Sequence, residues 1–241
     1  MSRQIGIGVV GLGFVGSGAH LPAFKKIENA RLVAVSDLNE ATLRKQAAKH
    51  EVPTTYADYR ELVRDSNVDV VVVSVPTQYH APVALAALSA GKHVLCEMPL
   101  APSLEEVDQM MQAAKRAVVI LMPSLNFRFT PNYIKAKQLI DQGAIARPTS
   151  VMYREFIPAL DLAKQWPPGA WVWDLRKSRG PLFTLSVWSI DLMRWLLGTE
   201  ITDVKSAVSY SPLNTEPELT GYNAFVHYRF ENGAIGCLQS S

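Results

Sequence analysis

The sequence predicts an α/β protein in which a doubly wound parallel sheet is followed by an α+β domain with a mostly antiparallel, open sheet. Short β-branched runs alternate with segments of helical period from residue 5 to about residue 125, which is the pattern of βαβ units. A glycine-rich motif separates the first expected strand from the first expected helix. Beyond Pro131 a helix, a tryptophan-rich loop and hairpin signals replace this alternation. We therefore place one domain at residues 1–125 and a second at residues 126–241.

Composition indicates a soluble globular chain, because 48% of the 241 residues are apolar, 19% are charged and the net charge is +2. Basic residues are scattered and no apolar run reaches the roughly 18 residues that span a bilayer, so we expect neither nucleic acid nor membrane as a partner. Cys96 and Cys237 lie in no CxxC pattern, which suits a cytoplasmic protein. No metal site is expected, because no spacing is shared by His20, His50, His93 and His227.

The first domain is expected to hold five strands, at residues 5–10, 31–36, 68–74, 93–97 and 118–122. The third of these lies in the run VDVVVVSVP, which is apolar on both faces and therefore central in the sheet. Helices are expected between the strands, at residues 38–50, 82–91 and 103–116. The last of them begins with a capping box of Ser103 and Glu106.

The second domain is expected to begin with a helix at residues 132–145 that ends near Gly143, followed by a strand at 148–159. A second helix at 185–198 has Gly198 as its cap. Strands at 204–210 and 222–230 lead into a turn at residues 231–233 and a last strand. The chain stops after that strand, so we expect either an incomplete domain or a sheet covered by another subunit. The apolar alternation of YNAFVHYRF favours a homo-oligomer.

The motif Gly11-Leu12-Gly13-Phe14-Val15-Gly16 stands between a strand and a helix, where a GxGxxG pattern binds a dinucleotide on a Rossmann sheet. The first glycine makes the tight turn, the second lets the pyrophosphate approach, and the third lets the helix pack on the strand. We expect Gly11, Gly13, Phe14, Val15 and Gly16 to line the cofactor site, with amides of the helix start binding the anion.

Asp37 ends the second strand, 21 residues after Gly16, where a carboxylate binds the ribose hydroxyls. The alternative role for Asp37 is the N-cap of a helix beginning at Leu38. Its charge would repel a 2′-phosphate, so NAD is favoured, while the nearby Arg44 keeps NADP open.

Further cofactor contacts are expected at the carboxyl end of the central strand, where open α/β sheets bind ligands. This segment supplies Ser74, Pro76, Thr77 and His80. His80 is also a candidate catalytic residue, and a structural hydrogen-bonding role is its alternative. We add Glu97, Met98 and Asn126 to the expected cofactor site.

The order and spacing of GVVGLGFVG, SVPTQYH, AGKHVLCE, NFRF and SIDLMRWLLG resemble the Gfo/Idh/MocA oxidoreductases, named after glucose-fructose oxidoreductase, inositol dehydrogenase and a rhizopine-catabolism protein. The resemblance covers nearly the whole chain. It implies an N-terminal Rossmann domain that binds a nicotinamide dinucleotide, and a C-terminal domain whose open sheet forms a dimer or tetramer interface. It also implies a C-terminal domain that runs about a hundred residues beyond Ser241.

Three positions depart from the pattern of that family. Its usual Glu-Lys-Pro, whose lysine lies beside the nicotinamide, is Glu97-Met98-Pro99 here. The aspartate and histidine that the family places four residues apart on a helix are Thr184 and Trp188. None of the three replacements can exchange a proton near neutral pH, so the family's usual acid–base chemistry is expected to be lost or replaced.

Two functions remain open from the sequence. One is an NAD(P)-dependent oxidoreductase acting on a sugar or cyclitol-like CH–OH group with an atypical proton carrier. The other is a catalytically silent dinucleotide-binding sensor or regulatory subunit. The ionisable residues that could carry the proton are Tyr79, His80, Glu97, Tyr153, Arg154, Glu155 and Asp191. The loop with Trp166, Trp171 and Trp173 near Lys164, Arg176 and Arg179 could bind a sugar or carboxylate, or belong to the core.

Overall fold

The chain forms two compact units, residues 1–124 and 125–241. The computed structural model describes residues 3–156, 161, 164, 166, 170–213 and 216–241, and it describes no side chains for residues 210–221.

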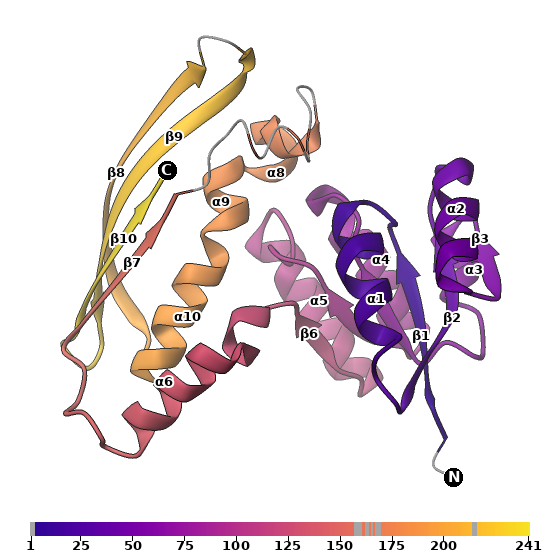
Figure 1. Cartoon of the computed structure of the whole chain (residues 1–241), viewed down its shortest axis with the longest axis horizontal. Coiled ribbons are helices and arrows are strands. Elements are labelled where there is room, and N and C mark those ends of the chain that lie inside the picture. Colours follow the sequence, from indigo (N-terminus) through magenta and orange to yellow (C-terminus); the bar gives the residue numbers. More distant parts are fainter. Residues whose placement is uncertain (1–2, 157–160, 162–163, 165, 167–169, 214–215) are drawn as a thin grey trace. The chain divides into compact units, whose positions relative to one another are not determined.

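The first unit is built on a six-stranded parallel sheet with the order β3-β2-β1-β4-β5-β6. Figure 1 labels β1, β2, β3 and β6 of this sheet. Its strands are β1 (Ile5–Val10), β2 (Ala30–Ser36), β3 (Thr54–Tyr56), β4 (Val70–Val73), β5 (His93–Cys96) and β6 (Leu121–Pro123). In β4, Val71, Val72 and Val73 are fully buried, which confirms the prediction of a central strand covered on both faces. The sheet order reverses between β1 and β4, and open sheets of this kind bind ligands at such a point.

Helices connect these strands: the π-helical segment η1 (Gly16–His20), α1 (Leu21–Phe24), α2 (Glu40–His50), α3 (Tyr59–Leu62), the 3-10 turn η2 (Thr77–Tyr79), α4 (His80–Ser89) and α5 (Leu104–Ala117). The predicted capping box is present, because Ser103 Oγ accepts a hydrogen bond from the Glu106 amide and donates one to its carboxylate. The expected strand at 118–122 starts later. Val118 closes α5 in the left-handed region with φ 56°, so β6 begins only at Leu121.

The second unit begins with η3 (Asn126–Phe129) and α6 (Pro131–Asp141), followed by β7 (Ser150–Glu155). Short helices η4 (Trp171–Trp173), α8 (Leu175–Ser178) and α9 (Pro181–Leu185) precede α10 (Val187–Leu197). The strands β8 (Ile201–Leu213), β9 (Glu216–Phe230) and β10 (Ile235–Ser240) complete a sheet with the order β7-β10-β9-β8. Only the β7–β10 pair is parallel among the pairs described, so the mostly antiparallel sheet is confirmed.

One face of this second sheet packs against α10. Alternate residues of β9, such as Ala224, Tyr228 and Phe230, are buried in a cluster with Met193 of that helix. Figure 1 shows α9 and α10 lying along the sheet. The predicted helix at 185–198 is split, because Ser186 interrupts the helical backbone between α9 and α10, while Gly198 caps it with φ 63° as expected. The expected strand at 148–159 is described as β7, and its last residues lie outside the described part of the chain.

Candidate functional site

The glycine motif forms a tight loop directly after β1. Gly11 has a φ of +89°, and a Cβ at this position would lie 2.4 Å from the carbonyl oxygen of Ser74. A Cβ on Gly16 would lie 2.0 Å from the carbonyl oxygen of Gly11. Both positions therefore require glycine, one for the left-handed turn and one for close packing of the helix on the loop.

Gly13 has the opposite surroundings, because a Cβ there would meet no heavy atom of the described residues within 4 Å. Helical backbone begins just after it, at Phe14, and continues through η1 and α1. The first turn of a helix presents backbone amides that lack intrahelical acceptors and attract anions. The open space at Gly13 is therefore placed where a pyrophosphate can approach the backbone.

Asp37, which directly follows β2, forms a hydrogen bond with the glycine loop. Its Oδ2 accepts a hydrogen bond from the Leu12 amide at 2.8 Å, and its Oδ1 accepts one from the Asn39 amide at 2.8 Å. Asn39 is the N-cap of α2, since its side chain accepts from the Thr42 amide. The alternative role of Asp37 as the cap is therefore wrong. Asp37 instead stands beside the loop, as a ribose-binding carboxylate does.

The segment after β4 contains a buried hydroxyl with no partner. Thr77 is 0% exposed, and its Oγ1 has no hydrogen-bond partner among the described residues. Buried polar groups are nearly always satisfied, so an orphan hydroxyl at a ligand-binding sheet edge is a candidate ligand contact.

His80 joins the ends of two neighbouring strands. Its Nε2 lies 2.8 Å from the carbonyl oxygen of Val75, after β4, and its Nδ1 lies 2.8 Å from that of Pro99, after β5. Burial lowers the pKa of His80, against the raising effect of those two carbonyls. With both ring nitrogens beside backbone oxygens, His80 has the geometry of the structural alternative.

A second histidine contacts a carboxylate at the end of β5. His20 Nε2, from the π-helical segment η1, lies 2.6 Å from Glu97 Oε1. The other oxygen of Glu97 accepts a hydrogen bond from the Met98 amide at 3.3 Å. Burial acts to raise the pKa of Glu97, but the bond and charge of His20, together with Ser124 and the Met98 amide, hold that pKa below its ordinary value. His20 was not among the ionisable candidates chosen from the sequence, because 77 residues separate it from Glu97.

The second unit contains the other positions singled out from the sequence. Thr184 is buried in α9, and its hydroxyl donates to the Gly180 carbonyl at 3.1 Å. Trp188, on α10, packs against Phe127 with ring centroids 6.2 Å apart. Asn126 begins η3, which contains Phe127. Neither the Thr184 hydroxyl nor the Trp188 indole replaces an aspartate or a histidine chemically.

The remaining ionisable candidates of this unit are engaged within it. Arg128 forms a two-pronged ion pair with the buried Asp191. Glu155 accepts hydrogen bonds from the hydroxyls of Ser186 at 3.0 Å and Ser240 at 2.6 Å. Burial and a hydrogen bond with a neighbouring tyrosine raise the pKa of Tyr153 well above its usual range, which makes it a poor base near neutral pH.

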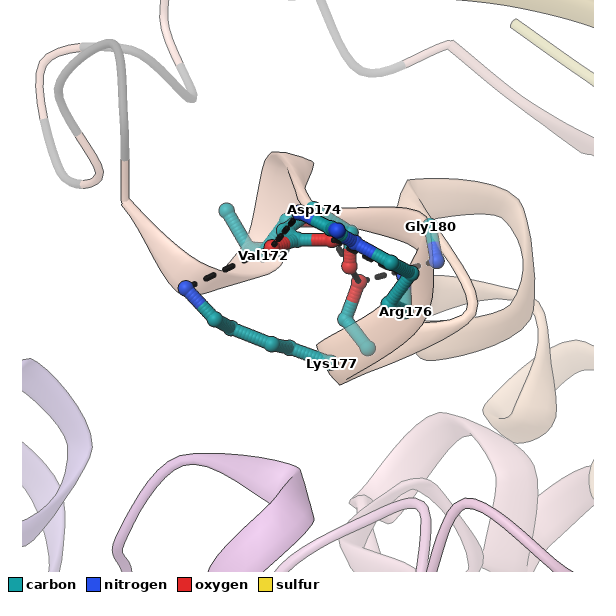
Figure 2. Close-up of polar contacts among 6 residues, drawn as sticks. Val172, Asp174, Arg176, Lys177 and Gly180 are labelled. Atoms are coloured by element: carbon teal, nitrogen blue, oxygen red, sulfur yellow. Dashed lines mark hydrogen bonds and ion pairs between the residues drawn. The ribbon is translucent and has the colours of Figure 1, made fainter.

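The basic part of the tryptophan loop is organised by Asp174. As Figure 2 shows, Asp174 caps α8, accepting from the Arg176 amide at 2.9 Å and from its guanidinium. The hydrogen bond from Arg176, with a lesser one from Lys177, lowers the pKa of Asp174 to about 2. Ser178 Oγ donates to the Val172 carbonyl at 2.7 Å, so this cluster stabilises the turn before α9. Trp173 Nε1 donates a hydrogen bond to the backbone carbonyl oxygen of Trp166.

The described residues contain neither a membrane-crossing helix nor a cluster of metal-ligating side chains. No helix in that part of the chain is long and apolar enough to cross a membrane. No group of three or more His, Cys, Asp or Glu side chains there could hold a metal ion.

A parallel sheet with a glycine loop at its switch point and a carboxylate after β2 defines the class of dinucleotide-binding Rossmann proteins. The comparisons with known proteins narrow this class. Residues 5–125 match the family described as an oxidoreductase family with an NAD-binding Rossmann fold, and residues 133–241 match the GFO/IDH/MocA C-terminal domain. The chain belongs to the Gfo/Idh/MocA family of oxidoreductases, and its first unit carries the NAD-binding Rossmann domain.

Several family members are similar over the whole chain. Myo-inositol 2-dehydrogenase of Thermotoga maritima is 35% identical over 98% of this chain and 68% of its own length. An NAD-binding oxidoreductase from Klebsiella pneumoniae superposes with a TM-score of 0.85 at 31% identity, covering 100% of this chain and 67% of that one. A levoglucosan dehydrogenase solved with NADH and L-sorbose has a TM-score of 0.83 at 28% identity, over 99% and 67%. The chain thus spans about two thirds of the length of these relatives.

Proposed function

We propose that the protein oxidises or reduces a sugar or cyclitol-like CH–OH group with NAD(H), using an atypical active site. The observation that carries the proposal is the glycine loop at the switch point, with Asp37 beside it. When bound, NAD supplies the hydride acceptor. Support for the substrate class comes from relatives named as inositol and levoglucosan dehydrogenases.

The residues present fit the cofactor. Gly13 would receive the pyrophosphate in open space, and the amides of the following helical turn would bind its charge. Asp37 would accept hydrogen bonds from the ribose, and the buried Thr77 hydroxyl would find its missing partner in the bound dinucleotide. Of the other cofactor contacts expected from the sequence, Ser74 and Pro76 lie between β4 and Thr77, and the Ser74 carbonyl oxygen lies beside Gly11 of the glycine loop.

NAD is the cofactor we propose in preference to NADP. The Asp37 carboxylate would repel a 2′-phosphate. Arg44, the residue that could attract one, is paired with Glu40 on the same helix at 2.8 Å. Isothermal titration with NADH and NADPH tests this choice. We expect NADH to bind more tightly, and Asp37→Ala to weaken NADH binding more than NADPH binding.

The active site is proposed to be atypical because Met98, Thr184 and Trp188 occupy the positions of the family's lysine, aspartate and histidine. A methionine has no ionisable proton, and the Thr184 hydroxyl is already used inside its helix. Another group must therefore move the proton if the protein is an enzyme.

Spectrophotometric assays of NADH formation from myo-inositol, scyllo-inositol, glucose and levoglucosan test the activity, and calorimetry tests NADH binding. Turnover of one of these polyols with NAD is the expected result. Failure to bind NADH would overturn the whole proposal.

The alternative is a silent dinucleotide-binding sensor or regulatory subunit, and the loss of all three family positions is the observation that favours it. NADH binding without turnover of any polyol would support this alternative over the enzyme.

We also propose that the protein forms a homo-oligomer in the cytoplasm. The free thiols of Cys96 and Cys237 suit a reducing compartment. The sheet face that α10 does not cover carries the exposed apolar side chains of Met152, Phe225 and Ile235, which another subunit would bury.

A further inference from the structure

We infer that His20, oriented by Glu97, is the catalytic base and acid that exchanges a proton with the substrate hydroxyl, in place of the lysine that Met98 replaces. This inference rests on the proposed oxidoreductase function. It starts from the 2.6 Å contact between His20 Nε2 and Glu97 Oε1.

The pair lies on the half of the sheet that serves the nicotinamide. A dinucleotide crosses a doubly wound sheet at the switch point, which here is between β1 and β4. Asp37 follows β2 and marks the adenosine side, so the nicotinamide belongs over the ends of β4 and β5. Glu97 directly follows β5. His20 closes η1, the π-helical segment in the helix after the glycine loop, and π-bulges of this kind are frequent at functional sites.

Glu97 orients the imidazole in the way that a catalytic carboxylate does. Its Oε1 contacts His20 Nε2, and its Oε2 accepts from the Met98 amide, so the carboxylate is held from both sides. A carboxylate at Nε2 selects the tautomer with the proton on that nitrogen and leaves Nδ1 as the acceptor. Among the described residues Nδ1 of His20 has no hydrogen-bond partner. The side chains of His20 and Glu97 are 11% and 14% exposed, which shields the pair but leaves it within reach of a ligand.

The proposed function supplies an acceptor for both the proton and the hydride that leave the substrate. The substrate O–H bond breaks and its proton passes to His20 Nδ1, while the C–H bond gives its hydride to NAD⁺. The products are a ketone or lactone, NADH and an imidazolium held by the Glu97 carboxylate. The reverse reaction returns the proton from Nδ1 to the carbonyl oxygen.

His80 does not serve this role equally well, although it lies on the same unit. Both of its nitrogens are 2.8 Å from backbone carbonyl oxygens, and the side chain is buried. Because each nitrogen already faces a backbone carbonyl oxygen, neither can face a substrate hydroxyl. We therefore assign His80 to positioning the loops after β4 and β5.

Turnover and NADH affinity of His20→Ala and Glu97→Gln separate catalysis from cofactor binding. Loss of a positioned general base is expected to lower kcat by about 10²- to 10⁴-fold. NADH affinity should change by no more than about threefold, because the Glu97 carboxylate, although expected from the sequence to contact the cofactor, is engaged by His20 and the Met98 amide. Added imidazole should restore part of the His20→Ala turnover and none of the Glu97→Gln turnover. Glu51→Gln is the matched control, since Glu51 forms an exposed ion pair with Lys25 on the same unit and should leave kcat unchanged.

A readout independent of turnover is the ¹⁵N NMR spectrum of the imidazoles. We expect the spectrum of the unmodified protein to show His20 protonated at Nε2, and the spectrum of Glu97→Gln to show no preference between the two nitrogens. The Nδ1 signal of His20 should differ between the NAD⁺ and NADH complexes. An Nδ1 signal equal in the two complexes, or unchanged kcat in His20→Ala, would overturn the assignment. Absence of NADH binding would instead overturn the proposed function, so the two failures are distinguishable.

Discussion

Gly13 is the single residue whose surroundings most directly test cofactor binding. We expect Gly13→Val to weaken NADH binding by at least about tenfold, because the new side chain would occupy the space proposed for the pyrophosphate. The fold should be preserved, since a Cβ there meets no described atom within 4 Å. Gly18→Val is the control, because Gly18 is equally open but lies beyond the loop. Equal NADH affinities of the two variants in calorimetry would contradict the proposed cofactor site.

The buried His80 is expected to make the stability of the protein depend on pH. Burial lowers its pKa below the ordinary 6.5, so the unfolded chain takes up the proton first as the pH falls. The stability contributed by the neutral, buried imidazole is therefore complete above about pH 6.5 and is lost as the pH falls toward the lowered pKa of the folded state.

Urea unfolding followed by far-UV circular dichroism at pH 7.5 and pH 5.5 measures this loss. His80→Gln should be less stable than the unmodified protein at pH 7.5 and should lose less stability on acidification. An unmodified protein equally stable at both pH values would contradict the prediction. All five tryptophans lie in the second unit, so their fluorescence reports that unit separately.

Single residues were predictable from the sequence where the chemistry is local. The tight turn at Gly11 and the close packing at Gly16 follow from a six-residue motif. The cofactor contacts expected of Gly13 and Asp37 stay predictions. The His20–Glu97 pair was not predictable, because nothing near either residue in the chain indicates the other. Asp191 was chosen as an ionisable candidate, but its partner Arg128 lies 63 residues away in sequence and satisfies it.

Elements were predictable where the apolar pattern is long, and less so at their ends. The strand in VDVVVVSVP and the helix ending at Gly198 follow directly from pattern and cap. The three-residue strand β3 was not expected, because it is too short to show an alternation. The π-helical turn of η1, which ends at His20, also leaves no periodic signal.

The ion pair between η3 and α10 is expected to stabilise the second unit. The guanidinium of Arg128 on η3 satisfies the carboxylate of Asp191 on α10, which is 6% exposed. Arg128→Met would leave this carboxylate buried without its partner, and such changes cost about 3–5 kcal/mol. Because the Arg128 side chain is 34% exposed and water can partly replace it, we expect the lower end of that range.

Urea unfolding followed by tryptophan fluorescence measures this cost in a double-mutant cycle. Arg128→Met and Asp191→Asn should each destabilise the second unit, and the double variant should be more stable than the sum of the two effects predicts. Additive effects would show that the pair contributes no coupling.

For the whole molecule, the change from βαβ units to hairpin signals was enough to predict two sheets of different type. The parallel order of the first sheet and the mixed order of the second agree with that expectation. What covers the open face of the second sheet does not follow from sequence periodicity, because alternation indicates two unlike faces without identifying their partners.

That open face supports the prediction about assembly. By the register of the strands, Met152 pairs with Cys237 and Phe225 pairs with Gln239, on the face opposite Tyr228 and Leu238. Met152 and Phe225 are 68% and 48% exposed, and a second copy of the chain would remove this apolar surface from water.

Phe225→Glu would place a charge in the middle of the proposed interface, where desolvating it without a partner is costly. We expect light scattering at micromolar concentration to show an oligomer for the unmodified protein and a monomer for Phe225→Glu. Leu104→Glu, which adds the same charge at an 83% exposed position of the first unit, should leave the oligomer intact. An unmodified protein that is monomeric and stays in solution would contradict the proposed assembly.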